Sequence, residues 1–411
     1  MTTNTSEIDE LAIFSGHPTF TEPIHVGRPN IGNRARFLER VNELLDRRWL
    51  TNSGPYVQEF EKRLAELLGV RHCIVVCNAT VALGIAIRAL KLEGEVIVPS
   101  FTFVATAHCL EWQGITPVFC DIDSRTHNLD PNQVERLITP LTTGIMGVHL
   151  WGRPCAVNEL ETLASSRGLK ILFDAAHAFG ATYGGRALGS FGDAEIFSFH
   201  ATKFFNSFEG GAVTTNNDEL AGQIRLMKNF GFAGYDNVIS PGTNGKMPEI
   251  SAAMGLTNLE SIEQFVTVNR SNYHAYRAAL DGVAGVSLIS YDESEQCNYQ
   301  YVVVKVNEQE AGIDRNLLAA TLHAENILAR RYFYPGCHRM EPYRSAPPQG
   351  GWQLPETEKL ADRVLVLPTG TAVETEDVAV VCQVIRTAVQ NAEAVKQRLA
   401  SDSKARVTLA D

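Results

Sequence analysis

Three groups that could do chemistry stand directly after apolar, strand-like runs. Asp174 ends the run "LKILFD", Lys203 follows "EIFSFH", and Asn78 to Thr80 lie between "HCIVVC" and a helical pattern. A partly desolvated lysine amine is a nucleophile toward aldehydes, and a buried carboxylate needs a cationic partner such as a ring nitrogen. The amides and hydroxyl of a helix start can hold a phosphate. Amine, carboxylate and phosphate cradle are together the parts that a pyridoxal phosphate site requires.

Taken singly, each group also has an ordinary structural explanation. Asp174 can cap the turn that follows it, Asn78 and Thr80 can cap a helix, and Lys203 can be a solvated loop residue. The chemical interpretation is favoured because all three follow strands of one predicted sheet. In open α/β sheets, ligands bind outside the carboxyl ends of the strands.

The elements that must position these residues follow from the hydrophobic pattern. Continuous apolar runs alternate with helical patterns from residue 72 onward, which predicts a mostly parallel sheet covered on both faces. After residue 180, "ATYGGRALGSFGDA" indicates a hairpin, and two short strands then complete the sheet, with an antiparallel member. A long helical stretch over about 247–280 connects to a smaller α+β unit.

This pattern divides the chain into four parts. We expect an N-terminal arm over 1–24, a large cofactor-binding domain over 25–265, a small C-terminal domain over 266–398, and a polar, frayed tail over 399–411.

Composition excludes several classes of function. The 411 residues carry 36 Lys and Arg against 47 Asp and Glu, a net charge of −11, so general attraction to nucleic acid or anionic lipid is not expected. The sequence has no leader-like start and no run long enough to span a bilayer, which favours the cytoplasm. The eight cysteines are spread thinly, as in a reduced core, and no spacing predicts a metal site.

Five motifs in order carry a family resemblance: "NATVAL", "VPSFTFVATA", "FDAAHAFGA", "FSFHATKFFNSFEGGA" and "GTNGKMPEISAAMGLTNLE". On these motifs the sequence resembles the sugar-nucleotide aminotransferases of the DegT/StrS type over roughly residues 25–390. The resemblance implies a pyridoxal-phosphate enzyme of fold type I. This is an α/β fold with a mixed, mostly parallel central sheet, helices on both faces and a smaller C-terminal α+β domain.

The resemblance also implies roles for individual residues. Lys203 is the expected Schiff-base lysine, and Asp174 is expected to pair with the pyridinium nitrogen. The other expected cofactor residues are Ala79, Thr80 and Ser198 at the phosphate, Phe103 stacked on the ring, His177 at the 3′-oxygen or against the ring, and Asn244 from the partner subunit of a homodimer.

The sequence departs from the family pattern at two positions. His177 stands where many members have glutamine, and by residue type alone it is equally a satisfied, half-buried histidine. Phe208 stands just before "EGG", where the family commonly has glycine, and the sequence offers no physical reason for it. Farther on, "ARRYFYPGCHRMEPY" either lines the sugar-nucleotide pocket through Tyr332, Tyr334 and His338 or forms a packed aromatic loop.

The implied reaction moves an amino group from L-glutamate to a keto-sugar nucleotide. Lysine at position 203 favours transamination over the deoxygenation that some histidine-bearing relatives catalyse. The "DAAH" motif resembles relatives acting at C4 of a dTDP-4-keto-6-deoxyhexose, and we expect a dTDP-4-amino-4,6-dideoxyhexose as product. A C3-specific enzyme, a transaminase of an inosose-type ketone and a non-catalytic sensing module remain alternatives.

Overall fold

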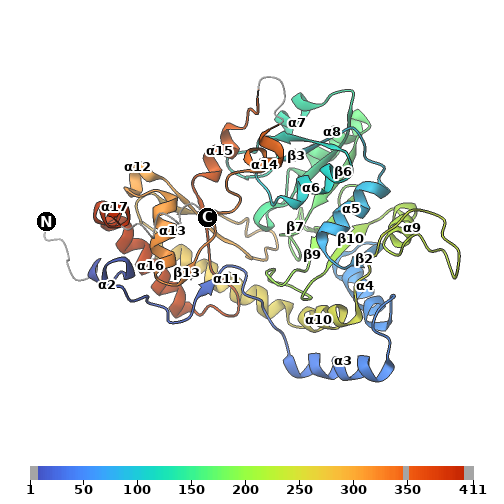
Figure 1. Cartoon of the computed structure of the whole chain (residues 1–411), viewed down its shortest axis with the longest axis horizontal. Helices are drawn as coiled ribbons and strands as arrows, with labels where there is room; N and C mark the ends of the chain where they lie inside the picture. Colours follow the sequence, from blue (N-terminus) through green and yellow to red (C-terminus); the bar gives the residue numbers. More distant parts are fainter. Residues whose placement is uncertain (1–7, 346–350, 402–411) are drawn as a thin grey trace.

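A seven-stranded sheet forms the centre of the larger part of the molecule (Figure 1). This computed structural model describes residues 8–345 and 351–401. The strand order is β2-β10-β9-β6-β5-β3-β4, and only β10 runs antiparallel to its neighbours, so the prediction of a mixed, mostly parallel sheet is confirmed. The strands are β2 (His72–Val76), β3 (Glu95–Pro99), β4 (Thr116–Cys120), β5 (Thr142–Val148), β6 (Lys170–Asp174), β9 (Ala194–Ser198) and β10 (Gly211–Thr215).

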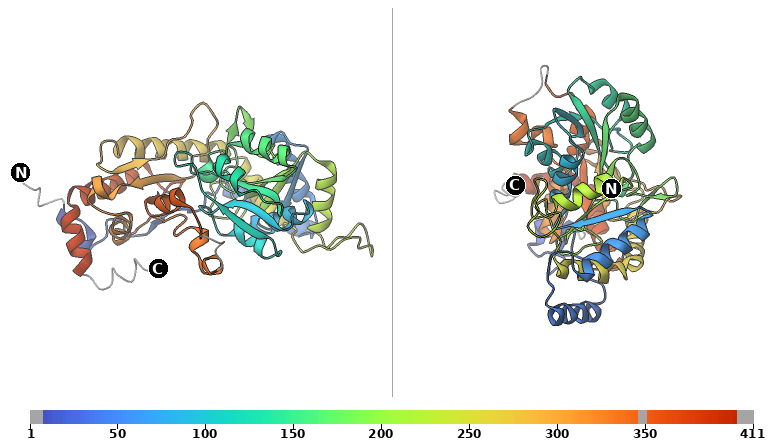
Figure 2. Two further views of the ribbon diagram at one scale, coloured as in Figure 1. Left: turned by 90° about the horizontal axis from the view of Figure 1, so that it is seen from above. Right: turned by 90° about the vertical axis from the view of Figure 1, so that its right-hand side faces the viewer.

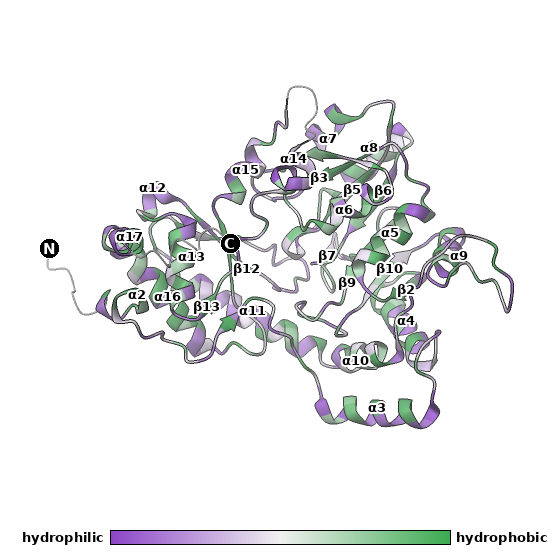
Figure 3. Cartoon of the chain, in the orientation of Figure 1, coloured by the Kyte–Doolittle hydropathy of each residue, from purple (hydrophilic) through white to green (hydrophobic). Residues whose placement is uncertain are grey.

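Helices cover both faces of this sheet because its strands are apolar on both faces. In β2, Cys73 and Val75 join one hydrophobic core, whereas Ile74 and Val76 join the other. The first core includes side chains of α4 (Pro55–Leu68), α7 (Pro131–Leu137), α8 (Val157–Arg167) and α10 (Glu249–Leu259). The second includes side chains of α5 (Ala79–Ala89), α6 (Ala105–Glu111) and α9 (Asp218–Met227). Figure 3 shows the hydrophobic colouring concentrated on these strands and on the helix faces turned toward them.

Two local expectations have different outcomes. The predicted hairpin is confirmed, since β7 (Thr182–Tyr183) pairs antiparallel with β8 (Arg186–Ala187). The long helical stretch over 247–280 is instead two helices, α10 and α11 (Ile262–Ala279). Helix α10 ends at Leu259, and Ser261, with φ −113° and ψ 6°, is the N-cap of α11. Helix α10 packs on α4 and on α3 (Arg34–Arg47), whereas α11 packs on α16 (Thr375–Gln390).

A smaller α+β unit lies beside the large sheet, as Figure 1 and the left view of Figure 2 show. Its antiparallel sheet has the order β11-β12-β14, from β11 (Val286–Leu288), β12 (Val302–Val306) and β14 (Val364–Leu367). Its helices are α11, α12 (Glu308–Ala311), α13 (Arg315–Ala324), α15 (Pro355–Ala361), α16 and α17 (Ala392–Ser401).

The N-terminal segment packs on this smaller unit. Helix α2 (Ala12–Ser15) is followed by β1 (Ile24–His25), which pairs parallel with β13 (Ile327–Leu328). Leu11 and Ile24 share a core with residues of β12 and α16. Within the described ranges, no helix is long and apolar enough to cross a membrane. The expected frayed tail falls mostly on 402–411, outside the described residues.

Candidate active site

Lys203 lies in the connection between β9 and β10, at the edge of the large sheet that faces the smaller unit. Its Nζ donates a hydrogen bond to the phenol oxygen of Tyr301 at 3.2 Å. Burial lowers the pKa of the Lys203 amine to about 8, against the opposite influence of Tyr332 and Asp174. A fraction of the amine is therefore neutral near physiological pH, as a nucleophile and base requires.

Asp174 ends β6 and is buried. Its Oδ2 accepts a hydrogen bond from Thr106 Oγ1 at 2.9 Å, and its Oδ1 accepts one from the Ala176 amide at 3.1 Å. Burial raises the pKa of Asp174, while these two donors and the charge of Lys203 act against the rise. In the described part of the chain this carboxylate has donors but no ion pair, so a cationic ring nitrogen would supply the charge that it lacks.

The ring of His177 packs beside Tyr301, with ring centroids 4.6 Å apart. Burial, with Lys203 nearby, holds the pKa of His177 well below its usual value, so the ring is neutral. The Trp151 amide donates to Nδ1 at 3.4 Å, and from this hydrogen bond we assign the proton to Nε2. His177 therefore has one N–H to offer, as an amide side chain at this position would.

Ala79 and Thr80, which we expected at the phosphate, lie at the start of α5. Asn78 caps the helix by accepting from the Val81 amide at 2.9 Å, so Ala79 and Thr80 lie in the first turn, where amides have no partner within the helix. Gly211 pairs with Ser198 across β9 and β10. A Cβ added to Gly211 would come within 2.6 Å of the Ala79 nitrogen, so the backbone of β10 lies very close to the start of α5. Residues far apart in sequence thus meet beside the first turn of α5, where backbone amides can hold an anion.

Phe103 and Asn244 lie on the outer side of this cradle. Phe103 is 58% exposed and, with Thr80, lines a hollow of about 610 Å³. Asn244 is exposed and pairs with Asn229 in an isolated bridge, next to Gly245, whose carbonyl accepts from the Cys77 amide at 2.8 Å. Both side chains are therefore available to a ligand or to a second copy of the chain.

The three aromatic candidates of the 329–343 loop have different surroundings. Tyr332 lines a small cavity together with Tyr301, next to Lys203. Tyr334 instead lies under two guanidinium groups, those of Arg315 and Arg331, at 5.1 and 5.5 Å from its ring centroid.

His338 is buried in the same loop, and both of its ring nitrogens are engaged. Nδ1 is hydrogen-bonded to Ser100 Oγ at 2.6 Å, and Nε2 lies 3.3 Å from Glu358. These contacts tie the loop to the end of β3 and to α15. The structure thus brings Tyr332 to the lysine, whereas the contacts of Tyr334 and His338 lie elsewhere.

Two residues of the site were missed by the sequence reasoning. Thr106 lies within the motif "VPSFTFVATA", and a hydroxyl in the first turn after a strand was a signal that could have identified it. Tyr301 lies in "NYQYVVVKV", 98 residues beyond Lys203, and nothing in that run indicates a polar role.

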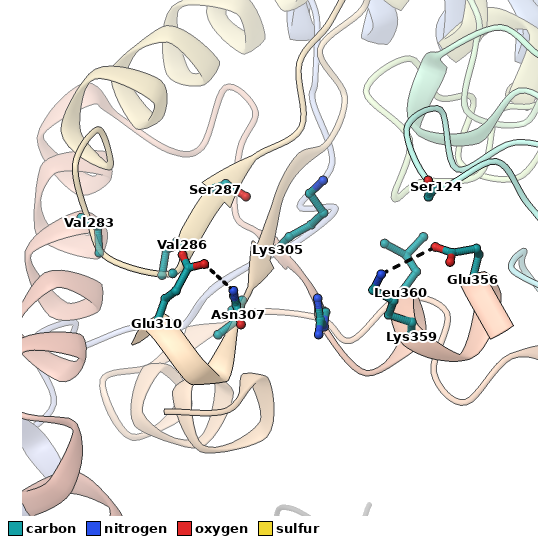
Figure 4. A pocket seen from close by; sticks show the side chains of 13 residues that line it. Ser124, Val283, Val286, Ser287, Lys305, Asn307, Glu310, Glu356, Lys359 and Leu360 are labelled. Atoms are coloured by element: carbon teal, nitrogen blue, oxygen red, sulfur yellow. Dashed lines mark hydrogen bonds and ion pairs between the residues drawn. The ribbon is translucent and has the colours of Figure 1, made fainter. Parts of the chain in front are cut away.

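A second hollow, of about 450 Å³, lies between β11, β12 and α15 (Figure 4). Its polar side chains largely engage one another, as in the hydrogen bond from Asn307 to Glu310 at 2.7 Å. None of the predicted site residues lines it. The group around Lys203 is therefore the candidate active site.

The model of the DegT/DnrJ/EryC1/StrS aminotransferase family matches residues 32–386. The chain belongs to this family. The protein is therefore a pyridoxal-phosphate-dependent aminotransferase of fold type I. The observed geometry fits the cofactor, because a lysine, a buried carboxylate with no ion pair among the described residues and a helix start all lie at or after the ends of strands of one sheet.

This DegT-family member is similar to individual relatives over nearly the whole length of those proteins. The dTDP-4-amino-4,6-dideoxy-D-glucose transaminase of Escherichia coli is 36% identical over 88% of this chain and 98% of that protein. The crystal structure of DesI in the presence of its TDP-sugar product superposes with a TM-score of 0.92 at 48% identity, covering 96% of this chain and all of that one. PseC of Helicobacter pylori, an aminotransferase of pseudoaminic acid biosynthesis, has a TM-score of 0.83 at 26% identity over 89% of this chain and 99% of that chain.

Proposed function

We propose that this protein transfers the amino group of L-glutamate to C4 of a dTDP-linked 4-keto-6-deoxyhexose. The transaminase chemistry is supported most directly by Lys203, whose amine lies in a buried site that lowers its pKa to about 8. The position on the sugar is supported by the relatives, since an E. coli relative is named for the 4-amino product and DesI was crystallised with a TDP-sugar.

Each residue of the site would contact the part of the cofactor that matches its charge or hydrogen-bonding groups. Asp174 would hold the ring nitrogen of pyridoxal phosphate, and Ala79, Thr80 and Ser198 would hold its phosphate, as the close approach of α5 and β10 supports. His177 would donate its Nε2–H to the 3′-oxygen, and Phe103 would cover the ring. Pyridoxal phosphate supplies an electron sink that makes the α-proton of the amino donor acidic.

Lys203 would carry that proton. An amine with a pKa of about 8 takes up and returns a proton readily near neutral pH, which suits a group that acts first as base and then as acid. The same amine would act with the amino donor in the first half of a ping-pong reaction and with the keto-sugar in the second half. Tyr332, which lines the cavity next to Lys203, is the aromatic residue of the 329–343 loop best placed to contact the sugar.

We also propose a homodimer with shared active sites, in which Asn244 reaches the phosphate of the partner's cofactor. The support is an exposed apolar surface around the cradle, where Trp112 is 92% exposed beside Phe103. Exposed apolar side chains also gather on the nearby segment 230–239, namely Phe230, Phe232, Tyr235, Val238 and Ile239. An apolar surface of this kind is typical of an interface.

The oligomeric state tests this part of the proposal. Sedimentation velocity should give a dimer for the wild type and a monomer for a Trp112→Asp, Phe232→Asp double variant. Leu141→Asp is the matched control, because Leu141 is 62% exposed and does not line the hollow next to the cradle. A wild-type monomer, or a double variant that stays dimeric, would contradict the shared site.

The substrate is tested by incubating the pyridoxamine form with candidate ketones. A dTDP-4-keto-6-deoxyhexose should restore the absorption of the lysine-bound cofactor, and NMR of the product should place the amine at C4. Amination at C3 would favour the C3-specific alternative, and turnover only with an inosose-type ketone would favour the aminocyclitol alternative. A protein that binds pyridoxal phosphate but shows no spectral change with L-glutamate would support the sensing module.

A further inference from the structure

The contact between Lys203 and Tyr301 joins the two parts of the molecule. Lys203 comes from the large sheet, whereas Tyr301 directly precedes β12 of the smaller unit. Besides the hydrogen bond at 3.2 Å, Nζ lies 5.9 Å from the centroid of the tyrosine ring. Tyr301 is 5% exposed and Lys203 is half-buried, so the hydroxyl meets the amine at a site that is partly shielded from water.

Several hydrogen bonds attach the segment 298–301 to residues of the large unit that lie near Lys203 in the structure or the sequence. Asn298 Nδ2 donates to the carbonyls of His177 and Phe179 at 2.8 and 3.0 Å. The oxygen of the Gln300 side chain accepts from the amide of Phe204, the residue after Lys203, at 3.4 Å. The segment is therefore held both to residues 177–179, which follow β6, and to the residue directly after Lys203.

Tyr301 is itself held by the aromatic residues around it. Its carbonyl accepts a hydrogen bond from the hydroxyl of Tyr291 at 2.8 Å, and that hydroxyl also lies 3.0 Å from the carbonyl of Trp151. The ring of Tyr301 packs against Trp151 and His177, with centroids 5.5 and 4.6 Å away. A phenol fixed on so many sides offers the amine of Lys203 a hydrogen-bonding partner at a constant position.

We propose that Tyr301 is a further catalytic residue, whose hydroxyl binds the free amine of Lys203 and holds it at the position from which it transfers the proton. This proposal rests on the transamination proposed above. It assigns Tyr301 no change of protonation, since the proton that leaves the donor's α-carbon forms a new N–H bond on Lys203 and is later returned from there.

The hydrogen-bonding capacity of a phenol suits both states of the amine. When Lys203 is neutral, the Tyr301 O–H can donate to the nitrogen lone pair, and when Lys203 is charged, an ammonium N–H donates to the phenol oxygen. Burial raises the pKa of Tyr301, which keeps the hydroxyl protonated throughout the physiological range. The hydrogen bond thus reverses direction as the proton arrives and leaves, and the nitrogen stays in place.

The charged state gains more from this contact, because hydrogen bonds that involve an ionised group are the stronger ones. Removal of the hydroxyl should therefore destabilise the ammonium form and make Lys203 more acidic. The size of the effect expected for one charge-assisted hydrogen bond is a shift of about one pH unit.

The test compares Tyr301→Phe with Tyr299→Phe. Tyr301→Phe keeps the ring that packs on His177 and removes only the hydroxyl. Tyr299→Phe is the matched control on the same segment, since the Tyr299 ring packs instead with Tyr273 and Tyr291, 5.3 and 4.9 Å away. Circular dichroism and thermal unfolding establish that both variants are folded.

The first readout needs no substrate. Trinitrobenzenesulfonate labelling of Lys203 in the cofactor-free protein, followed by peptide mass spectrometry across pH, should give a midpoint near 8 for the wild type. The midpoint should fall by about one unit in Tyr301→Phe and stay unchanged in Tyr299→Phe. An unchanged midpoint in Tyr301→Phe, or an equal shift in both variants, would overturn the proposal.

The second readout is steady-state transamination. We expect kcat to fall about 10- to 100-fold in Tyr301→Phe with KM for L-glutamate little changed, because proton transfer rather than binding is impaired. A rise in KM alone would assign Tyr301 to binding and overturn its role in proton transfer. If the wild type transfers no amino group, the proposed function fails, while the labelling midpoint still decides whether Tyr301 holds the amine.

Discussion

Gly211 and Ala79 approach so closely that a Cβ on Gly211 would come within 2.6 Å of the Ala79 nitrogen and 2.8 Å of the Asn78 carbonyl carbon. Both neighbouring atoms belong to the backbone, so no side-chain rotation can make room. This approach brings the first turn of α5 against the end of β9, where Ser198 lies. The spacing of the phosphate cradle therefore depends on the absence of a side chain at residue 211.

Gly211→Ala should damage the cradle while leaving the rest of the fold intact. We expect a loss of about 1–3 kcal/mol in the free energy of unfolding and weaker binding of pyridoxal phosphate, measured by urea denaturation and by equilibrium dialysis. Gly222→Ala is the matched control: Gly222 lies within α9 with open space around it, so the added methyl group should be neutral or slightly stabilising. Equal cofactor affinity in the two variants would argue against the cradle.

Lys203 should react as an unusually acidic lysine. With a pKa of about 8, about half of the Lys203 amine is neutral at pH 8, whereas an ordinary lysine is almost fully charged there. Lys203→Ala should abolish turnover and still fold, which near-UV circular dichroism can establish. A lysine-bound chromophore that persists in this variant would place the attachment at another residue.

The same lysine predicts how stability depends on pH. The pKa of Lys203 is lower in the folded, cofactor-free protein than in the unfolded chain, so the charged amine destabilises the fold at pH 7. This penalty decreases as the pH rises from about 8 to about 10.5, and the free energy of unfolding rises with it. Lys203→Met removes this dependence. The variant should melt above the wild type at pH 7, and the difference in Tm should shrink by pH 10; a constant difference would contradict the assignment.

Asp174 should depend on the hydroxyl of Thr106. Asp174→Asn removes the charge opposite the ring nitrogen, and we expect kcat to fall by about 100-fold or more, since the ring is then no longer kept protonated. Thr106→Val keeps the shape and removes one donor to the carboxylate, so the pKa of Asp174 should rise and kcat should fall less, about tenfold. Equal losses would show that the threonine acts in some other way than through the carboxylate.

His177 should be replaceable by a side chain that donates one hydrogen bond. His177→Gln offers an amide N–H and an oxygen acceptor, and it should retain activity within about tenfold. His177→Leu has similar bulk without a donor, and it should lose more activity and shift the absorption of the bound cofactor. Similar losses in the two variants would indicate that packing against Tyr301 is what matters at this position.

Phe208 shows what backbone geometry adds to a motif. Its φ of 64° lies in the left-handed region, which glycine adopts without strain and a phenylalanine rarely adopts. The phenylalanine is 43% exposed and packs edge-on against Phe37 of α3, with ring centroids 5.6 Å apart. The reason for this residue could not be inferred from the sequence, because the residue type at a single position does not reveal its φ.

The sequence determined the features of this protein that depend on local pattern. Continuous apolar strands between helices fix a sheet buried on both faces, and the ends of β6 and β9 then place Asp174 and the approach to Lys203 at one edge. The helix start at Ala79 was visible for the same reason, since a cap and its amides are local. The positions of Asp174, Lys203 and Ala79 at or after the ends of strands of the large sheet were therefore predictable.

Only the tertiary structure decided which distant residues complete the site. Tyr301 reaches Lys203 because the smaller unit docks against the large one, and Thr106 reaches Asp174 because α6 packs on β3 and β4 of the large sheet. The same docking turns His338 toward Ser100 and Glu358 and leaves Tyr332 beside the lysine. Contacts of this kind depend on how elements pack in three dimensions, and neither periodicity nor spacing along the chain encodes that packing in a form that can be read locally.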